Sequence, residues 1–126
     1  MKKAIFTDKA PAAIGPYSQA VVIDKLVYLS GQLGIDPATG EFVPGLVADQ
    51  TEQIFKNIKA VLAEANLTLK NVVKTTVFLS DMLDFGAMNE VYAKHFEEPY
   101  PARSAVAVKT LPKNGLVEIE VIAIID

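Results

Sequence analysis

The chain of 126 residues has no cysteine, one histidine and one arginine. Without cysteine it can form neither a disulfide framework nor a thiolate metal site. A single histidine cannot supply the clusters that usually bind zinc or iron, and it excludes a Ser-His-Asp triad unless His95 itself is the base. We therefore expect no metal site.

Long apolar runs and an excess of positive charge are absent too. No apolar stretch of a signal peptide follows the first residues, because Thr7, Asp8 and Lys9 interrupt it, and no segment approaches the length of a membrane span. The formal net charge is −3, and the lysines are scattered. Because nucleic-acid binding depends largely on neutralising phosphates, a nucleic-acid partner is disfavoured. We expect a cytoplasmic protein with no membrane partner.

Apolar residues, in contrast, make up 51% of the chain. That proportion is enough for a core, and the length predicts one domain over residues 1–126. Because so short a chain has a large surface for its volume, its surplus apolar residues are expected in a subunit interface. The composition therefore predicts a homo-oligomer.

Hydrophobic periodicity predicts an α+β fold. A strand, helix and strand in succession predict a parallel crossover, and the order of elements predicts a mixed sheet with both helices on one face. The other face then lacks a cover, which again favours self-association. The predicted strands are residues 3–6, 17–23, 26–34, 72–80, 103–109 and 116–125, and the predicted helices are residues 46–66 and 85–96.

The only arginine, Arg103, stands at the start of a predicted strand, behind the bend Pro99-Tyr100-Pro101. Its planar guanidinium can bind a carboxylate or phosphate with two hydrogen bonds. A solvated surface arginine is the alternative. We treat Arg103 as a candidate anion-binding residue because, apart from His95, all the other basic residues are lysines.

Polar residues within the predicted strands give further candidates. Gly31 interrupts a strand beside Ser30, which indicates either a bulge or a close approach of the backbone to a ligand. The last strand places Glu118 and Glu120 on one face, together with apolar residues. A buried carboxylate there would have a raised pKa and could serve as an acid or base, whereas two solvated glutamates at a sheet edge are the alternative.

The second predicted helix has an apolar side that includes Phe85 and Tyr92. His95 lies on the same side, so we interpret it as a packing or interface residue rather than a catalyst. Asn89 is a polar residue close to this stripe, and we expect it to face an interior or a cleft.

Several motifs occur in order across essentially the whole chain: Ala10-Pro-Ala-Ala-Ile-Gly-Pro-Tyr17-Ser-Gln, Leu29-Ser-Gly-Gln32, Lys74-Thr-Thr-Val-Phe78, Pro101-Ala-Arg-Ser104 and Glu118-Ile-Glu120. In this order and at this spacing they closely resemble the Rid family of reactive-intermediate deaminases (RidA, also called YjgF). The resemblance implies a chorismate-mutase-like fold, in which a mixed sheet is backed by two helices, and a homotrimer with three clefts between subunits.

The activity that this resemblance implies is hydrolysis of 2-imino or 2-enamino acids, such as 2-aminoacrylate and 2-iminobutanoate, to 2-oxo acids and ammonia without a cofactor. Arg103 is similar to the family arginine that binds the substrate carboxylate, and Glu118 to the carboxylate that handles water. The positions similar to cleft-lining residues are Tyr17, Ser30, Gly31 and Asn89. Ala105 stands where some relatives have cysteine, so a role for that cysteine does not transfer.

The distance between the two catalytic candidates poses a problem. In a simple hairpin turning near Asn114, Arg103 pairs near Ala123, about five residues or roughly 16 Å from Glu118. Either the register differs, or the two groups meet across a subunit boundary, which we favour. Two other functions stay open: a regulatory module that binds small carboxylates without turnover, and a ribonuclease or translation inhibitor.

Overall fold

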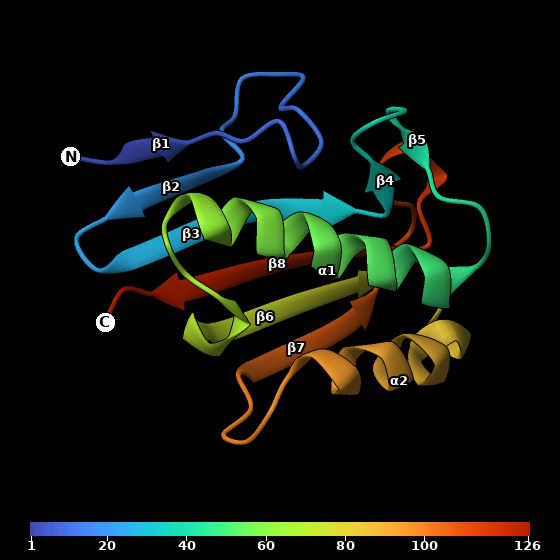
Figure 1. Cartoon of the computed structure of the whole chain (residues 1–126). Helices are drawn as coiled ribbons and strands as arrows, with labels where there is room; N and C mark the ends of the chain where they lie inside the picture. The colour runs from blue at the N-terminus through green and yellow to red at the C-terminus, as the bar shows by residue number, and fades with distance from the viewer.

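The computed structural model describes residues 1–126, and its main feature is a six-stranded mixed sheet in the order β1-β2-β3-β8-β6-β7 (Figure 1). All neighbouring strands are antiparallel except β6 and β7, which are parallel. The strands are β1 (Lys3–Ile5), β2 (Ala20–Ile23), β3 (Leu26–Leu33), β6 (Val72–Leu79), β7 (Ala102–Ala107) and β8 (Val117–Ile124).

Two helices, α1 (Val47–Glu64) and α2 (Phe85–His95), lie on one face of this sheet (Figure 1). The predicted α+β fold with a mixed sheet and two helices on one face is therefore confirmed. A small ladder of β4 (Ile35–Asp36) and β5 (Glu41–Phe42) occupies a region predicted as a turn and an irregular connector. Neither helix combines the length and the apolar character needed to cross a membrane.

The expected hairpin between the last two strands is wrong. β6 lies between β7 and β8, because α2 returns the chain to the outer edge of β6 and the following segment then crosses to the other side of that strand. This segment is tied at both ends, by Val108 N donating to Leu79 O at 2.8 Å and by Ser80 N donating to Leu116 O at 3.0 Å. The parallel strands of the predicted crossover, β3 and β6, are separated by β8.

Helix α1 covers the sheet because one stripe of it is apolar, and Ile54, Ile58 and Leu62 are fully buried. The same helix buries a polar residue that periodicity did not predict. Asn57 donates hydrogen bonds to Leu33 O at 3.1 Å and Ile35 O at 3.0 Å, and so fixes the end of β3 against the helix. These bonds satisfy backbone carbonyls that would otherwise be buried without partners.

The alternation predicted for the last strand is confirmed. Val117, Ile119 and Val121 of β8 are buried under the helices, whereas Glu118 and Glu120 lie on the opposite face. That opposite face has no helix of this chain over it (Figure 1). Several of its large side chains are partly exposed, among them Tyr28 at 42% and Ile124 at 38%, which is unusual for an isolated sheet face.

Candidate functional site

Four of the six predicted site residues line one hollow of about 680 Å³ at the end of β3. The hollow lies between the loop that precedes β2, the end of β3 and the start of β8. Its walls include the apolar residues Ile14, Leu33 and Ile35 beside the polar candidates, so a small molecule with a short apolar side chain fits its chemistry. The four predicted residues are Tyr17, Ser30, Gly31 and Glu118.

The loop that carries Tyr17 is held in place by the buried side chain of Gln19. Its amide oxygen accepts from Thr7 N at 2.8 Å, and its amide nitrogen donates to Thr7 O at 3.0 Å and to Pro11 O at 2.8 Å. Residues 17–19, which periodicity assigned to a strand, therefore belong to this loop, and β2 begins only at Ala20. No pattern in the sequence indicated this role of Gln19, because its partners are backbone atoms distant along the chain.

Ser30 connects the same loop to β3. Its hydroxyl donates to Ser18 O at 2.6 Å, and its backbone N donates to Gln19 O at 3.0 Å. With its proton engaged, the hydroxyl oxygen keeps lone pairs that can accept a hydrogen bond from a ligand. Ser30 therefore both positions Tyr17, which is 52% exposed, and presents an acceptor.

Gly31 lies at an irregularity in the pairing of β3 with β8, which shifts register between Leu29 and Gln32. A Cβ atom on Gly31 would lie 2.8 Å from Cδ of Glu118, closer than Cβ atoms pack. The bulge interpretation is therefore confirmed, and the close approach that the structure shows is to the side chain of Glu118, so an approach to a ligand stays a prediction. The absence of a side chain here is what lets Glu118 occupy its place.

Glu118 is the carboxyl group whose chemistry is most altered. Partial burial raises its pKa above the usual range, and repulsion from Glu120 raises it further. A raised pKa makes the carboxylate a better proton acceptor and lets its protonated form act as an acid nearer neutral pH. Glu120 is exposed and does not line the hollow, so of the two glutamates only Glu118 combines access to the hollow with a raised pKa.

The other two predicted site residues, Asn89 and Arg103, lie together elsewhere. Nη1 of Arg103 donates to Oδ1 of Asn89 at 2.6 Å, and the guanidinium carbon lies 4.7 Å from the ring centroid of Tyr92 and 5.3 Å from that of Phe85. The only contact between basic and acidic side chains within 4.0 Å joins His95 to Glu52, so no carboxylate lies that close to Arg103. The guanidinium is exposed, oriented by a helix, and free to bind an anion.

The strand register explains why the two groups are apart. Arg103 pairs with Thr75 in the parallel β6–β7 ladder, and Thr75 is fully buried beneath the helices. Glu118 pairs with Phe78, which alternates to the other face of β6. Arg103 and Glu118 therefore stand on opposite faces of the sheet, two strands and three residues apart, or roughly 14 Å. One copy of the chain cannot bring both to the same small molecule.

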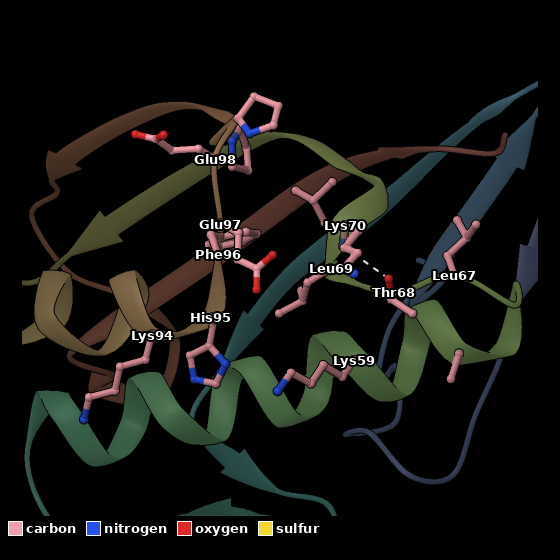
Figure 2. A pocket seen from close by; sticks show the side chains of 14 residues that line it. Lys59, Leu67, Thr68, Leu69, Lys70, Lys94, His95, Phe96, Glu97 and Glu98 are labelled. Carbon is pink, nitrogen blue, oxygen red and sulfur yellow. Dashed lines mark hydrogen bonds between the residues drawn. The ribbon is translucent and has the colours of Figure 1, made fainter.

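A second hollow, of about 840 Å³, is lined by none of the six predicted site residues (Figure 2). It is lined by His95, which the sequence predicted to be a packing or interface residue. In Figure 2 the side chain of His95, which is the last residue of α2, lies against α1 between the side chains of Lys94 of α2 and Lys59 of α1. The imidazole stacks on Phe55 at 4.4 Å between ring centroids, and its Nε2 lies 2.6 Å from Oε1 of Glu52. His95 thus packs between the helices, as predicted. No group of three or more histidine, aspartate and glutamate side chains gathers in a metal-binding arrangement.

Comparison with known proteins gives concordant results. A family model described as "Endoribonuclease L-PSP" matches residues 7–125. A Bos taurus protein named 2-iminobutanoate/2-iminopropanoate deaminase is 53% identical over 124 residues, which cover 98% of this chain and 90% of that protein.

Two solved structures share the fold over nearly the whole length. RidA from the Antarctic bacterium Psychrobacter sp. is 54% identical with a TM-score of 0.93, and the match covers 98% of this chain and 99% of that one. The structure of E. coli TdcF with bound serine is 44% identical with a TM-score of 0.92, at the same coverage.

Proposed function

This chain belongs to the endoribonuclease L-PSP family, also called the Rid or YjgF family, and from that membership we propose that it hydrolyses 2-imino and 2-enamino acids to 2-oxo acids and ammonia. The observation that carries the proposal is the 53% identity, over 98% of the chain, to a protein named 2-iminobutanoate/2-iminopropanoate deaminase. The groups that such a reaction needs are present: an arginine without a carboxylate partner, and a carboxyl group with a raised pKa.

In this proposal Arg103 binds the substrate carboxylate. The bond to Asn89 uses one of the five N–H donors of the guanidinium, which leaves a pair for a bidentate contact with an anion. Fixing the carboxylate at two points also fixes the neighbouring C=N carbon, and such positioning can supply a large share of the barrier reduction. The serine bound to TdcF is consistent with a small molecule of this size in a protein of the same fold.

In this proposal Glu118 accepts a proton from the attacking water and donates it to the leaving nitrogen. As water attacks the carbon of the protonated imine, a water proton passes to the carboxylate and a C–O bond forms, giving a carbinolamine. Glu118 then returns that proton to the nitrogen, the C–N bond breaks and ammonia leaves. The hydroxyl gives its own proton to the Glu118 carboxylate and becomes the carbonyl of the 2-oxo acid, and the departing ammonia can take this proton up as ammonium. An enamine first takes a proton on its β-carbon to become the imine. General acid–base catalysis of this kind contributes about 10²–10⁴ in rate.

A second copy of the chain completes the site. Tyr17, Ser30, Gly31 and Glu118 would come from one subunit, and Arg103 with Asn89 from its neighbour. The separation of the two groups onto opposite faces of one sheet supports this arrangement, as does the uncovered face that carries Tyr28 and Ile124. We propose a homotrimer with three such clefts, the number resting on the family resemblance.

Mixed oligomers test the shared site. Arg103→Ala and Glu118→Ala chains should each be inactive alone, but one-to-one mixtures refolded together should regain about a quarter of the wild-type activity, because about one interface in four then pairs two intact residues. The measurement is ammonia release after co-refolding, with separately refolded and then combined samples as the control. Failure of co-refolded oligomers to regain activity would exclude a site shared between subunits.

The reaction itself is tested by a coupled assay. An amino-acid oxidase or a dehydratase generates imino acids of different size, and their decay is followed with and without this protein. Faster decay, with 2-oxo acid and ammonia formed in equal amounts, is expected. Binding of 2-oxo acids by calorimetry without faster decay would instead identify a regulatory binding module.

The family description also names an endoribonuclease. The net charge of −3 and the scattered lysines disfavour an RNA substrate. RNA cleavage that survives both Arg103→Ala and repurification would reverse this conclusion.

A further inference from the structure

We propose that Tyr92, held by Thr75 and lying over the guanidinium of Arg103, is a positioning residue that fixes the plane of this guanidinium for the incoming carboxylate, with Phe85 as its accessory. The proposal rests on the function proposed above and adds residues that the sequence identified only as part of an apolar stripe. Figure 1 shows α2, which carries both aromatic residues, running alongside β7.

The first reason is the way in which the guanidinium is held. Two aromatic rings and one amide oxygen surround it, and the rings attract the cation through their faces. A ring attracts the cation without accepting a conventional hydrogen bond from it, whereas a carboxylate partner would occupy two of its N–H donors. The aromatic contact therefore orients Arg103 and leaves its donors available to a ligand.

The second reason is that Tyr92 is itself immobilised. Its hydroxyl shares a buried hydrogen bond of 2.7 Å with Oγ1 of Thr75, and its ring packs against Phe55 and Phe96 at centroid distances of 5.8 Å and 4.8 Å. Burial raises the pKa of the Tyr92 phenol, so the group stays neutral and keeps this bond. Because its hydroxyl is hydrogen-bonded and its ring is packed, Tyr92 can hold the flexible side chain of Arg103 in one orientation.

The third reason is the position of Thr75. It is the residue of β6 that pairs with Arg103 in β7, so strand and helix hold the arginine from two sides. The strand sets the starting point of the arginine side chain, and the Thr75–Tyr92 bond sets the position of the ring relative to that same strand. A hydroxyl at residue 75 and a phenol at residue 92 are thus both required for this arrangement.

The test compares Tyr92→Leu with Leu62→Ala, which removes a fully buried side chain of α1 and so weakens the same core. We expect Tyr92→Leu to lower kcat/KM about tenfold, mostly through a higher KM and weaker binding of an unreactive 2-oxo acid. Leu62→Ala should reduce thermal stability but change kcat/KM less than about twofold. Tyr92→Phe, which keeps the ring and loses the bond to Thr75, should lie between them.

A spectroscopic readout is independent of catalysis, because Arg103 is the only arginine in the chain. Selective ¹⁵N-arginine labelling gives one Nε–H signal, which the rings should shift upfield in the wild type and in Leu62→Ala. Tyr92→Leu should move it toward the position of a solvated arginine. If Tyr92→Leu does not fold, Phe85→Leu should give a smaller change in the same direction.

The outcomes separate the two proposals. An unchanged Nε–H signal and unchanged kcat/KM in the folded Tyr92→Leu or Phe85→Leu variant would overturn the positioning role while leaving deamination intact. A wild type without deaminase activity would refute the proposed function, and the arginine signal would still decide whether Tyr92 orients the guanidinium.

Discussion

Replacement of Arg103 by lysine is expected to lower kcat/KM for 2-iminobutanoate about 100-fold without unfolding the protein. A lysine ammonium keeps the charge, but it cannot make two parallel hydrogen bonds to a carboxylate while it also donates to Asn89 beside the ring of Tyr92. Loss of a charge-assisted pair of hydrogen bonds corresponds to about 1.5–3 kcal/mol, or about 10- to 100-fold. Misplacement of the C=N carbon adds to this loss.

Steady-state kinetics with freshly generated imino acid measures the effect, and thermal unfolding confirms that the variant is folded. Lys94→Arg is a matched control, because it makes a lysine–arginine exchange on the same side of the protein outside the proposed site. Near-full turnover by Arg103→Lys would refute the role of the guanidinium. Loss of turnover in Lys94→Arg would mean that a lysine–arginine exchange on α2 disturbs turnover without touching the proposed bidentate contact.

Replacement of Glu118 by glutamine is expected to lower kcat by about 10²–10⁴ with a smaller change in KM, because an amide cannot accept a proton from water. The wild-type rate should fall on the acid side as pH drops through the raised pKa of Glu118, where the carboxylate becomes protonated. The residual rate of Glu118→Gln should lack this acid limb. A pH–rate profile of both proteins measures the difference.

Glu120→Gln is the control for the second glutamate of the same face. It should keep most of the activity, but it should move the acid limb to lower pH, because repulsion from Glu120 contributes to the raised pKa of Glu118. Retention of the acid limb in Glu118→Gln, or its loss in Glu120→Gln, would show that our proposal assigns proton transfer to the wrong carboxylate.

The same carboxyl group has a consequence for stability. The pKa of Glu118 is higher in the folded than in the unfolded state, so the folded state binds this proton more strongly, and the protein loses stability as pH rises above the ordinary value of 4.5 through the raised pKa. Glutamine is neutral at every pH and avoids this loss. Thermal unfolding at pH 7 should therefore find Glu118→Gln at least as stable as the wild type, which separates lost catalysis from lost folding.

Short-range patterns in the chain predicted much of what the structure contains. Alternation along residues 117–124 correctly placed Glu118 and Glu120 on one face, and the helix predicted over residues 46–66 is found as α1, after which Asn66 adopts a left-handed φ of 59°. These features depend on interactions among residues a few positions apart. Local propensity and periodicity therefore contain the necessary information.

Long-range contacts were harder to predict. The buried bonds of Gln19 to Thr7 and Pro11 removed residues 17–19 from the predicted strand, and nothing in their own hydrophobicity indicated this. Gly31 was identified as a bulge or a close approach, but its specific neighbour, Glu118, lies far along the chain. In each case the deciding partner is distant in sequence.

By itself, the sequence determined that the chain has no thiolate chemistry, where its two helices and main strands lie, and that Arg103 and the glutamates of the last strand, Glu118 and Glu120, are its candidate reactive groups. Only the tertiary structure decided that β6 separates β7 from β8, that Glu118 rather than Glu120 lines the hollow, and that Arg103 and Glu118 consequently stand on opposite faces of one sheet. The physical reason is that strand order is selected by the packing of the whole core, to which every element contributes, whereas side-chain alternation along a strand follows from its own backbone geometry.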